Sequence, residues 1–260
     1  MKIGILSKRE VKLTEKMKIY FESLGHEIRL YTPNNLYINE SLLKNDFYIL
    51  KSKKLIYLYA GCYLNKKGIP VIPEPNISYK QRNRREAHLL LKKAGLNSPK
   101  FYTGATAKLK QTLKTEEYPF VLKPVMGSGG AGIKVINSKR DFSSKDDKII
   151  FVEQYIEGTH YNVCFIGDEI CAYIKPPLST NDIPMECIAV ADDIEGMVNK
   201  WKKDYDILFG HLDMVREHDS DKVFVVDVGP FPQFYNWEFD ENPAPKICDL
   251  ILQRLKRLKS

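Results

Sequence analysis

The sequence predicts an α/β and α+β protein made of one parallel α/β lobe and two α+β lobes. Short apolar runs alternate with helix-patterned segments through the first 75 residues, as in parallel α/β units. Later apolar runs follow one another in pairs with short turns between them, which is typical of antiparallel hairpins. At 260 residues the chain is long enough for several small lobes around a substantial core.

Two breaks in the pattern divide the chain. The segment Pro73-Glu74-Pro75-Asn76 interrupts the alternation of strands and helices. Gly158 follows a polar run, Glu153–Glu157, at the end of a later strand. We therefore predict lobes at residues 1–75, 76–157 and 158–260.

The first lobe is expected to hold a parallel sheet. Strands are expected at residues 2–6, 26–31, 47–50 and 71–72, and helices at 11–24 and 55–64. Lys8 and Arg9 follow the first strand, at the edge of a parallel sheet where ligands bind. They are either anion-binding residues or a solvated basic turn.

The second lobe is expected to begin with a helix over residues 78–93, which Gly95 ends. The first turns of this helix carry Lys80, Arg82, Arg84 and Arg85. Four cations within six residues repel one another unless an anion lies nearby. Scattered solvated charges are the alternative interpretation.

A lysine and a glycine-rich loop follow. Pro119–Leu122 is a short apolar strand, and Lys123 stands at its end. Because glycine has no Cβ, the loop that follows lets backbone N–H groups approach phosphate oxygens closely. The segment is either a phosphate-covering lid or a flexible hairpin, and its order differs from the GxxxxGK[ST] loop. The loop residues are Gly127, Ser128, Gly129, Gly130 and Gly132.

The third lobe is expected to bring two carboxylates together. A strand is expected at residues 149–152, near the end of the second lobe. In the third lobe strands are expected at residues 161–166, 170–175, 208–216 and 223–228, and helices at 192–204 and 245–258. The last two strands pair Asp213 with Asp227, each flanked by apolar residues. Mg²⁺ is usually held by one or two carboxylates together with substrate phosphates. The alternative is that these aspartates cap turns or pair with lysines.

Composition narrows the partners. The net charge of +7, from 40 Lys and Arg against 33 Asp and Glu, favours anionic ligands. Nucleic-acid motifs are absent from the sequence, and no apolar run approaches the roughly 20 residues of a membrane span. The five cysteines are scattered without metal-binding spacing, so we expect reduced thiols in a cytoplasmic monomer.

The order of these parts resembles the ATP-grasp superfamily over nearly the whole chain. The resemblance implies ATP held between the two α+β lobes, with Lys123 on phosphates and the glycine loop as its lid. The run Phe151–Ile156, FVEQYI, is similar to the family's adenine-binding hinge. The implied nucleotide ligands are Arg84, Lys123, Gly127, Ser128, Gly129, Gly130, Glu153, Gln154, Ile156 and His160, and the Mg²⁺ ligands are Asp213 and Asp227.

Within the superfamily, the ending Asp227-Val-Gly-Pro-Phe-Pro resembles the inositol-phosphate kinases more than the ligases. Their Arg-Arg-Glu helix and basic hairpin exit are similar to Arg84–Glu86 and Lys175-Pro176-Pro177. The resemblance implies that Lys123, Arg85 and Lys175 serve catalysis. It also implies an anionic, phosphorylated substrate bound by Lys8, Arg9, Arg85, Lys175 and Gly229.

Two positions depart from that family. Gly229 replaces an asparagine that usually serves as a metal ligand, and Asn162 replaces a lysine in the hairpin. His160 and His211 are the histidines nearest the expected site, and each is either structural or a base for a hydroxyl acceptor.

Three functions remain open from the sequence. The first is an ATP- and Mg²⁺-dependent kinase acting on an inositol phosphate by in-line phosphoryl transfer. The second is a carboxylate–amine ligase of the same fold, and the third is a nucleotide or polyphosphate sensor without catalysis. A pocket in which Lys8, Arg84, Arg85 and Lys175 converge would indicate a phosphorylated substrate, whereas a mixed polar pocket would indicate a ligase.

Overall fold

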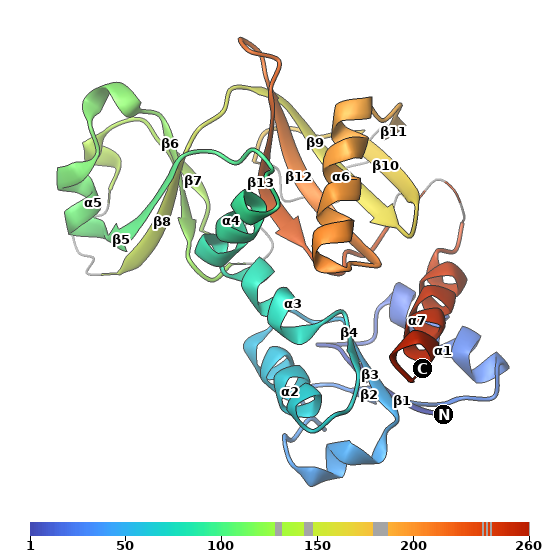
Figure 1. Ribbon diagram of the computed structural model, residues 1–260. Helices are drawn as coiled ribbons and strands as arrows, with labels where there is room; N and C mark the ends of the chain where they lie inside the picture. The colour runs from blue at the N-terminus through green and yellow to red at the C-terminus, as the bar shows by residue number, and fades with distance from the viewer. Residues whose placement is uncertain are drawn as a thin grey trace.

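Three sheets form three lobes in the computed structural model of this protein (Figure 1). One sheet is parallel and lies in the N-terminal lobe. The other two sheets are antiparallel. The predicted α/β and α+β class is therefore confirmed. The structure describes residues 1–127, 132–142, 148–178, 187–235, 237, 239 and 241–259.

The N-terminal lobe has the predicted parallel sheet, in the order β2-β1-β3-β4. The apolar runs that predicted these strands fill two cores, one on each face of the sheet. The elements are β1 (Lys2–Leu6), α1 (Lys12–Ser23), β2 (Glu27–Tyr31), the 3₁₀ turn η1 (Glu40–Lys44), β3 (Phe47–Leu50), α2 (Leu55–Lys66) and β4 (Val71–Ile72).

The helix predicted over residues 78–93 is wrong as a single element. The structure has two helices, α3 (Pro75–Arg82) and α4 (Arg84–Lys93), separated by Asn83 in extended conformation. Asn83 pairs with Met126 as an isolated β-bridge, and its side chain accepts a hydrogen bond from the Glu86 N–H at 3.3 Å. The break occurs because Asn83 caps the second helix and joins the segment after β6.

The central lobe holds the predicted lysine hairpin within an antiparallel sheet, in the order β5-β8-β6-β7. Its elements are β5 (Phe101–Ala105), α5 (Thr106–Thr112), η2 (Thr115–Glu117), β6 (Phe120–Pro124), β7 (Lys134–Ile136), η3 (Lys139–Asp141) and β8 (Ile149–Gln154). The predicted loop residues Ser128, Gly129 and Gly130 lie outside the described residues.

The C-terminal lobe is a five-stranded sheet in the order β11-β10-β9-β12-β13. Helix α6 covers one face, where Val198 and Trp201 share a core with Leu212 and Met214. Both predicted hairpins, β9–β10 and β12–β13, are confirmed. The elements are β9 (Gly158–Ile166), β10 (Glu169–Ile174), β11 (Cys187–Ile188), α6 (Asp192–Tyr205), β12 (Phe209–Glu217) and β13 (Val223–Gly229).

The chain ends with α7 (Ala244–Lys259), which returns to the N-terminal lobe and lies beside α1 (Figure 1). The Tyr20 hydroxyl donates a hydrogen bond to Asp249 Oδ1 at 2.9 Å across this contact. Ile247 and Ile251 share a core with Ile3 and Ile5 of β1 and with Phe209 of β12. The N-terminal and C-terminal lobes are thus joined by one hydrophobic core.

Two further findings concern the cysteines and the helices. The five cysteines, all in the described part of the chain, form no disulfide bond. Within the described parts of the chain, none of the helices combines the length and the apolar character needed to cross a bilayer.

Candidate functional site

Two carboxylates face each other on neighbouring strands of the C-terminal lobe. Asp213 of β12 and Asp227 of β13 are direct partners in the antiparallel register, as the hairpin pattern predicted. Asn162 of β9 lies opposite Asp213 on its other side and donates from Nδ2 to Asp213 Oδ1 at 2.7 Å. The asparagine that departs from the kinase pattern therefore orients one of the two carboxylates.

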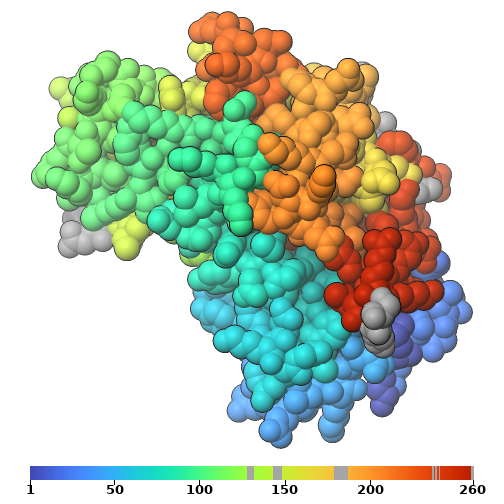
Figure 2. Space-filling view, in the orientation of Figure 1, coloured from blue at the N-terminus to red at the C-terminus, as the bar shows by residue number. Residues whose placement is uncertain are grey.

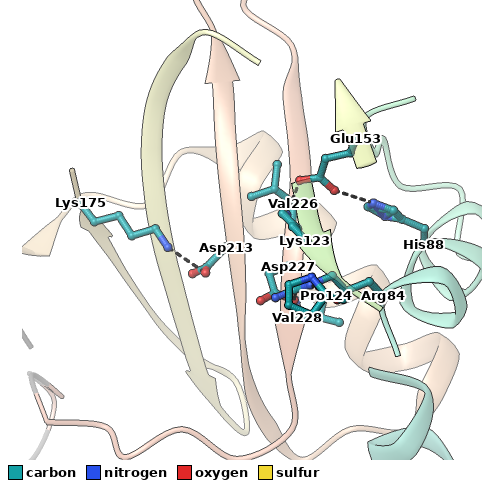
Figure 3. A network of polar contacts seen from close by, with 10 residues as sticks. All are labelled: Arg84, His88, Lys123, Pro124, Glu153, Lys175, Asp213, Val226, Asp227 and Val228. Atoms are coloured by element: carbon teal, nitrogen blue, oxygen red, sulfur yellow. Dashed lines mark hydrogen bonds and ion pairs between the residues drawn. The ribbon is translucent and has the colours of Figure 1, made fainter. Parts of the chain in front are cut away.

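Each carboxylate has a cation from another element against it (Figure 3). Lys175, just after β10, lies 2.8 Å from Asp213 Oδ2, and Arg84, at the start of α4, lies 3.3 Å from Asp227 Oδ1. Burial opposes the ionisation of Asp213, but Lys175 and His211 outweigh it and hold the pKa of Asp213 below its usual value. Burial likewise opposes the ionisation of Asp227, and Arg84 and Lys123 lower its pKa. Both groups are thus carboxylates at neutral pH.

The predicted phosphate ligand Lys123 lies in a second, fully buried network beside this pair (Figure 3). Its ammonium forms an ion pair with Glu153 and donates to the Val226 carbonyl at 3.0 Å. The other oxygen of Glu153 is 3.0 Å from Nε2 of His88, and the His88 ring packs against both Phe101 and Phe151, which stack on each other. Burial raises the pKa of Glu153, and burial lowers the pKa of His88 to about 4.

Since His88 is neutral, its Nε2–H donates to the Glu153 carboxylate and its Nδ1 carries the lone pair. That buried Nδ1 has no hydrogen-bond partner among the described residues. The carboxylate of Glu153 is therefore occupied by Lys123 and His88. We therefore expect the backbone of Gln154 and Ile156, and not the Glu153 side chain, to contact adenine. This contact stays a prediction.

Other predicted nucleotide ligands gather near Arg84. Its Nε donates to the Pro124 carbonyl at 3.1 Å, and a Cβ on Gly127 would lie 2.9 Å from its guanidinium. Glycine at 127 thus permits a close approach of the loop to Arg84. His160 is buried between the two networks, and burial, together with Lys175, lowers its pKa to about 4. It is a neutral imidazole, and its Nε2 lacks a hydrogen-bond partner in the described structure.

The predicted substrate cations differ in exposure and in their partners. Lys8 and Arg9 are exposed after β1, and Arg85 is half exposed and bound to Glu86 at 2.8 Å. Arg84 and Lys175 are bound to the two aspartates. A common basic pocket for a phosphorylated substrate stays a prediction.

Gly229 lies opposite His211 in the β12–β13 register. Any Cβ at 229 would overlap the His211 imidazole, so this ring fills the space that a side chain at 229 would occupy. Burial lowers the pKa of His211 to about 4. The imidazole is thus neutral and stands on the strand that carries Asp213, two residues away.

Two lysines that the sequence analysis missed lie at the same centre. Lys51 and Lys53 follow β3, and the Lys51 and Ser52 N–H groups donate to the Leu6 carbonyl at the end of β1. Burial lowers the pKa of Lys53, while Asp227 and Asp213 both act to raise it, so its ammonium lies near both carboxylates. The sequence could have indicated these two lysines, because they follow a predicted strand of the parallel sheet just as Lys8 does.

Lys51 joins the N-terminal lobe to the segment that follows the β12–β13 hairpin. Its ammonium donates to the carbonyls of Phe231 at 2.7 Å and Pro232 at 2.9 Å, and burial lowers its pKa to about 7. Lys51 thus fixes the segment after Gly229 against the parallel sheet and brings Lys53 toward the aspartates.

The donor set fits a hard divalent cation that is shared with a substrate. Asp213 and Asp227 supply ionised oxygens on facing positions. Within the described residues, no group of three or more His, Cys, Asp or Glu side chains forms a closed metal site. Two carboxylates plus substrate phosphates are the usual protein environment of Mg²⁺.

Comparisons with known proteins agree with this geometry. Residues 82–191 match the family model of an ATP-grasp domain. The chain is 23% identical over 300 residues to the tetrahydromethanopterin:alpha-L-glutamate ligase of Methanocaldococcus jannaschii, a match covering 98% of this chain and 100% of that protein. Two further curated relatives match only in part, since the alignments cover 23% and 27% of their lengths.

Solved structures share the fold over nearly the whole chain. The RimK domain ATP-grasp protein of Sphaerobacter thermophilus superposes with a TM-score of 0.73 at 15% identity, covering 97% of this chain and 100% of that one. The ATP-grasp ligase PsnB, solved with a minimal precursor, Mg and ADP, superposes with a TM-score of 0.67 at 15% identity, covering 96% and 97%.

The chain therefore has the ATP-grasp fold, and the domain match supports its place in that superfamily. The two proteins named above with a stated activity, the Methanocaldococcus jannaschii enzyme and PsnB, are ligases, and one of the partly matching relatives is named as a formate-dependent phosphoribosylglycinamide formyltransferase. They do not support the finer resemblance to inositol-phosphate kinases.

Proposed function

We propose that this protein, which has the ATP-grasp fold, is an ATP- and Mg²⁺-dependent carboxylate–amine ligase. In the proposed reaction a substrate carboxylate attacks the γ-phosphorus of ATP, and ADP leaves as an acyl phosphate forms. An amine then attacks the acyl carbon, inorganic phosphate leaves, and the amine loses a proton to solvent as the amide forms.

The observation that carries this proposal is that basic side chains around the site are paired with carboxylates of the protein. Arg84 and Lys175 are bound to Asp227 and Asp213, and Arg85 is bound to Glu86. A highly charged inositol phosphate needs several unpaired cations around it, because each phosphate carries more than one negative charge near neutral pH. A substrate carboxylate carries a single charge, and Lys53 beside the aspartates suffices to attract it.

The carboxylate pair supports the role of ATP in this proposal. Asp213 and Asp227 would hold Mg²⁺, which when bound neutralises charge on the β- and γ-phosphates during transfer. Asn162 orients Asp213, and Lys175 and Arg84 keep both carboxylates ionised.

The central lobe would hold the rest of the nucleotide. Lys123 of β6 pairs with Glu153 of β8, and the backbone of Gln154 and Ile156 lies at and just beyond the end of β8. Gly127, the first residue of the glycine loop, lies close to the Arg84 guanidinium. We propose that this loop excludes water, which would otherwise hydrolyse the acyl phosphate.

An inositol-phosphate kinase is the second candidate function, because the segment Asp227–Pro232 at the end of the last strand resembles these kinases. The two candidates differ in what ADP release requires. A ligase forms ADP only with a carboxylate, and it forms an amide only with an amine as well. A kinase forms ADP with an inositol phosphate alone.

The experiment is to measure ADP release with Mg²⁺ and ATP against panels of amino acids, dicarboxylates, amines and inositol phosphates. For any active carboxylate, ¹⁸O in its carboxyl group should appear in the inorganic phosphate, because one carboxyl oxygen leaves with it. Turnover with an inositol phosphate alone would overturn the proposal in favour of the kinase. Tight ATP binding without turnover on any panel would instead indicate a sensor.

A further inference from the structure

A separate cavity lies on the far side of β4 from the rest of the parallel sheet. It has a volume of about 210 Å³ and lies among α3, β4, the start of β12 and the end of α7. Figure 2 shows the α3, α6 and α7 segments meeting on this face of the molecule. Apolar side chains form most of its wall, among them Val71, Ile77, Leu208, Phe209, Pro230 and Leu258.

Two buried polar atoms in the wall have no hydrogen-bond partner among the described residues. They are Ser78 Oγ and Gln81 Oε1, and the two side chains are 1% and 3% exposed. Both residues stand on α3 at a spacing that places them on one helix face. A buried polar atom left without a partner destabilises the fold, so a donor from a bound molecule would be favourable here.

The charged groups in the described wall already make polar contacts. Asp206 forms an ion pair with the Arg254 guanidinium, and Glu74 accepts from the Ile77 N–H at 2.6 Å and from Asn76 Nδ2 at 2.8 Å. A charged ligand would have to displace these contacts. A neutral ligand fits the mainly apolar wall better.

We propose that this cavity is a binding site for a small, neutral, mainly apolar molecule that carries a hydrogen-bond donor. An apolar cavity of about 150 Å³ is sufficient to bind benzene, so this one accommodates a single substituted ring. The donor of the ligand bonds to Gln81 Oε1 or Ser78 Oγ, and the ring contacts the apolar wall. This site is distinct from the aspartate pair and does not depend on the proposed ligase activity.

The test uses phenol and toluene, which have similar shapes but differ in one hydroxyl donor. Titration of each into the full-length protein, followed by amide chemical shifts in NMR spectra, gives the two affinities without ATP. We expect saturable shifts around α3, with phenol binding about three- to tenfold more tightly than toluene. A crystal soaked with phenol should show its ring between Ile77 and Leu208.

Variants locate the site and its polar contact. The double variant Ser78→Ala/Gln81→Leu should reduce phenol affinity to that of toluene, whereas Gln111→Leu on the exposed surface of α5 should change neither affinity. Ile77→Trp and Leu258→Trp, from two different helices, should each fill the cavity and abolish binding of both probes. Ile56→Trp, on the exposed face of α2, is the matched control for a surface tryptophan.

Three results would overturn the proposal. They are shifts that do not saturate in the unmodified protein, binding that survives both tryptophan variants, or soaked crystals with only water beside Ser78 and Gln81. A circular dichroism spectrum and melting temperature for each variant show that the chain is folded when binding is measured.

Discussion

Two neighbouring polar networks in this protein differ in how open they are. In the Lys123–Glu153–His88 network the side chains are 5%, 2% and 4% exposed, whereas Asp213 and Asp227 are 19% and 36% exposed. In the closed network every charge has a fixed partner from the central lobe or β13. In the open pair the cations come from α4 and from the end of β10.

This difference in exposure indicates that one network mainly stabilises the fold and that the other mainly serves the reaction. A buried ion pair that loses one partner leaves a charge that water cannot solvate. A half-exposed carboxylate can exchange its partner, so a metal ion or a phosphate can take the place of a side-chain contact. We therefore expect changes in the closed network to act mainly on folding and changes in the open pair to act mainly on turnover.

The largest expected effect is on stability, from Lys123→Met. This change leaves Glu153 buried with His88 as its only side-chain partner, so the free energy of unfolding should fall by about 3–5 kcal/mol. Urea denaturation measures it, with Lys134→Met on the exposed strand β7 as the control.

Adding Glu153→Gln to Lys123→Met removes the unpaired charge and should restore part of that stability. ATP turnover should stay low in the double variant if Lys123 also binds phosphate. A loss below about 1 kcal/mol in the single variant would show that the closed network is not structural.

The second effect is on turnover, from Asp213→Asn or Asp227→Asn. Each variant should lower kcat by about a hundred- to a thousandfold, because it removes an ionised oxygen ligand that acts during transfer. Stability should change much less than in Lys123→Met, since asparagine keeps an acceptor and the repulsion between the two aspartates is relieved. Steady-state ADP release and thermal melting give both quantities.

Asp219→Asn, exposed in the turn between β12 and β13, is the matched control and should behave as the unmodified protein. If the two site variants kept full turnover, the metal assignment would be wrong.

The third effect is a pH dependence that comes from the closed network. The pKa of His88 is about 4 in the folded protein against 6.5 when unperturbed, so the unfolded chain binds more protons between these values. His88 therefore contributes stability that is full above pH 6.5 and is lost as pH falls toward 4, on the order of 3 kcal/mol in total.

Urea titrations at several pH values measure this slope. His160 and His211 contribute to the same window because their pKa values are also about 4. His88→Phe should make the slope shallower by about 1.4 kcal/mol per pH unit, whereas His218→Phe in the exposed turn should leave it unchanged. An unaltered slope in His88→Phe would contradict the neutral, buried state of this histidine.

The smallest expected effect concerns Lys53, which approaches the open pair from the N-terminal lobe. Lys53→Met should raise KM for the carboxylate substrate about tenfold, equivalent to about 1.4 kcal/mol of binding, with a smaller change in KM for ATP. Lys54→Met, on the exposed neighbour, is the control. A change confined to KM for ATP would place Lys53 on the nucleotide instead.

Local patterns in the sequence were sufficient for most of the fold. Alternating apolar runs gave the parallel lobe and both hairpins, because each strand buries its own apolar face. The break at Asn83 was missed, although Asn83 and Glu86 have the spacing of a capping box. The continuous helical pattern on both sides concealed it.

The candidate site was predictable only in part. Asp213 and Asp227 were found because a hairpin register brings them together within about 15 residues of chain, a local property. Arg85, Lys8 and Arg9 were expected to bind a substrate, and this stays a prediction, since the structure shows only that Arg85 pairs with Glu86 and that the other two are exposed. A basic residue has the same appearance in a sequence whether it meets a ligand, a carboxylate or water.

By itself the sequence determined the order of elements, the lysine hairpin and the facing aspartates, since each depends on residues close together in the chain. Tertiary structure alone decided the partners of the charges: Lys51 with Phe231, Lys123 with Glu153, and Arg84 with Asp227. These pairs are set by which surfaces pack together and exclude water. Burial decides whether a charge must have a partner, and burial exists only after the lobes have assembled.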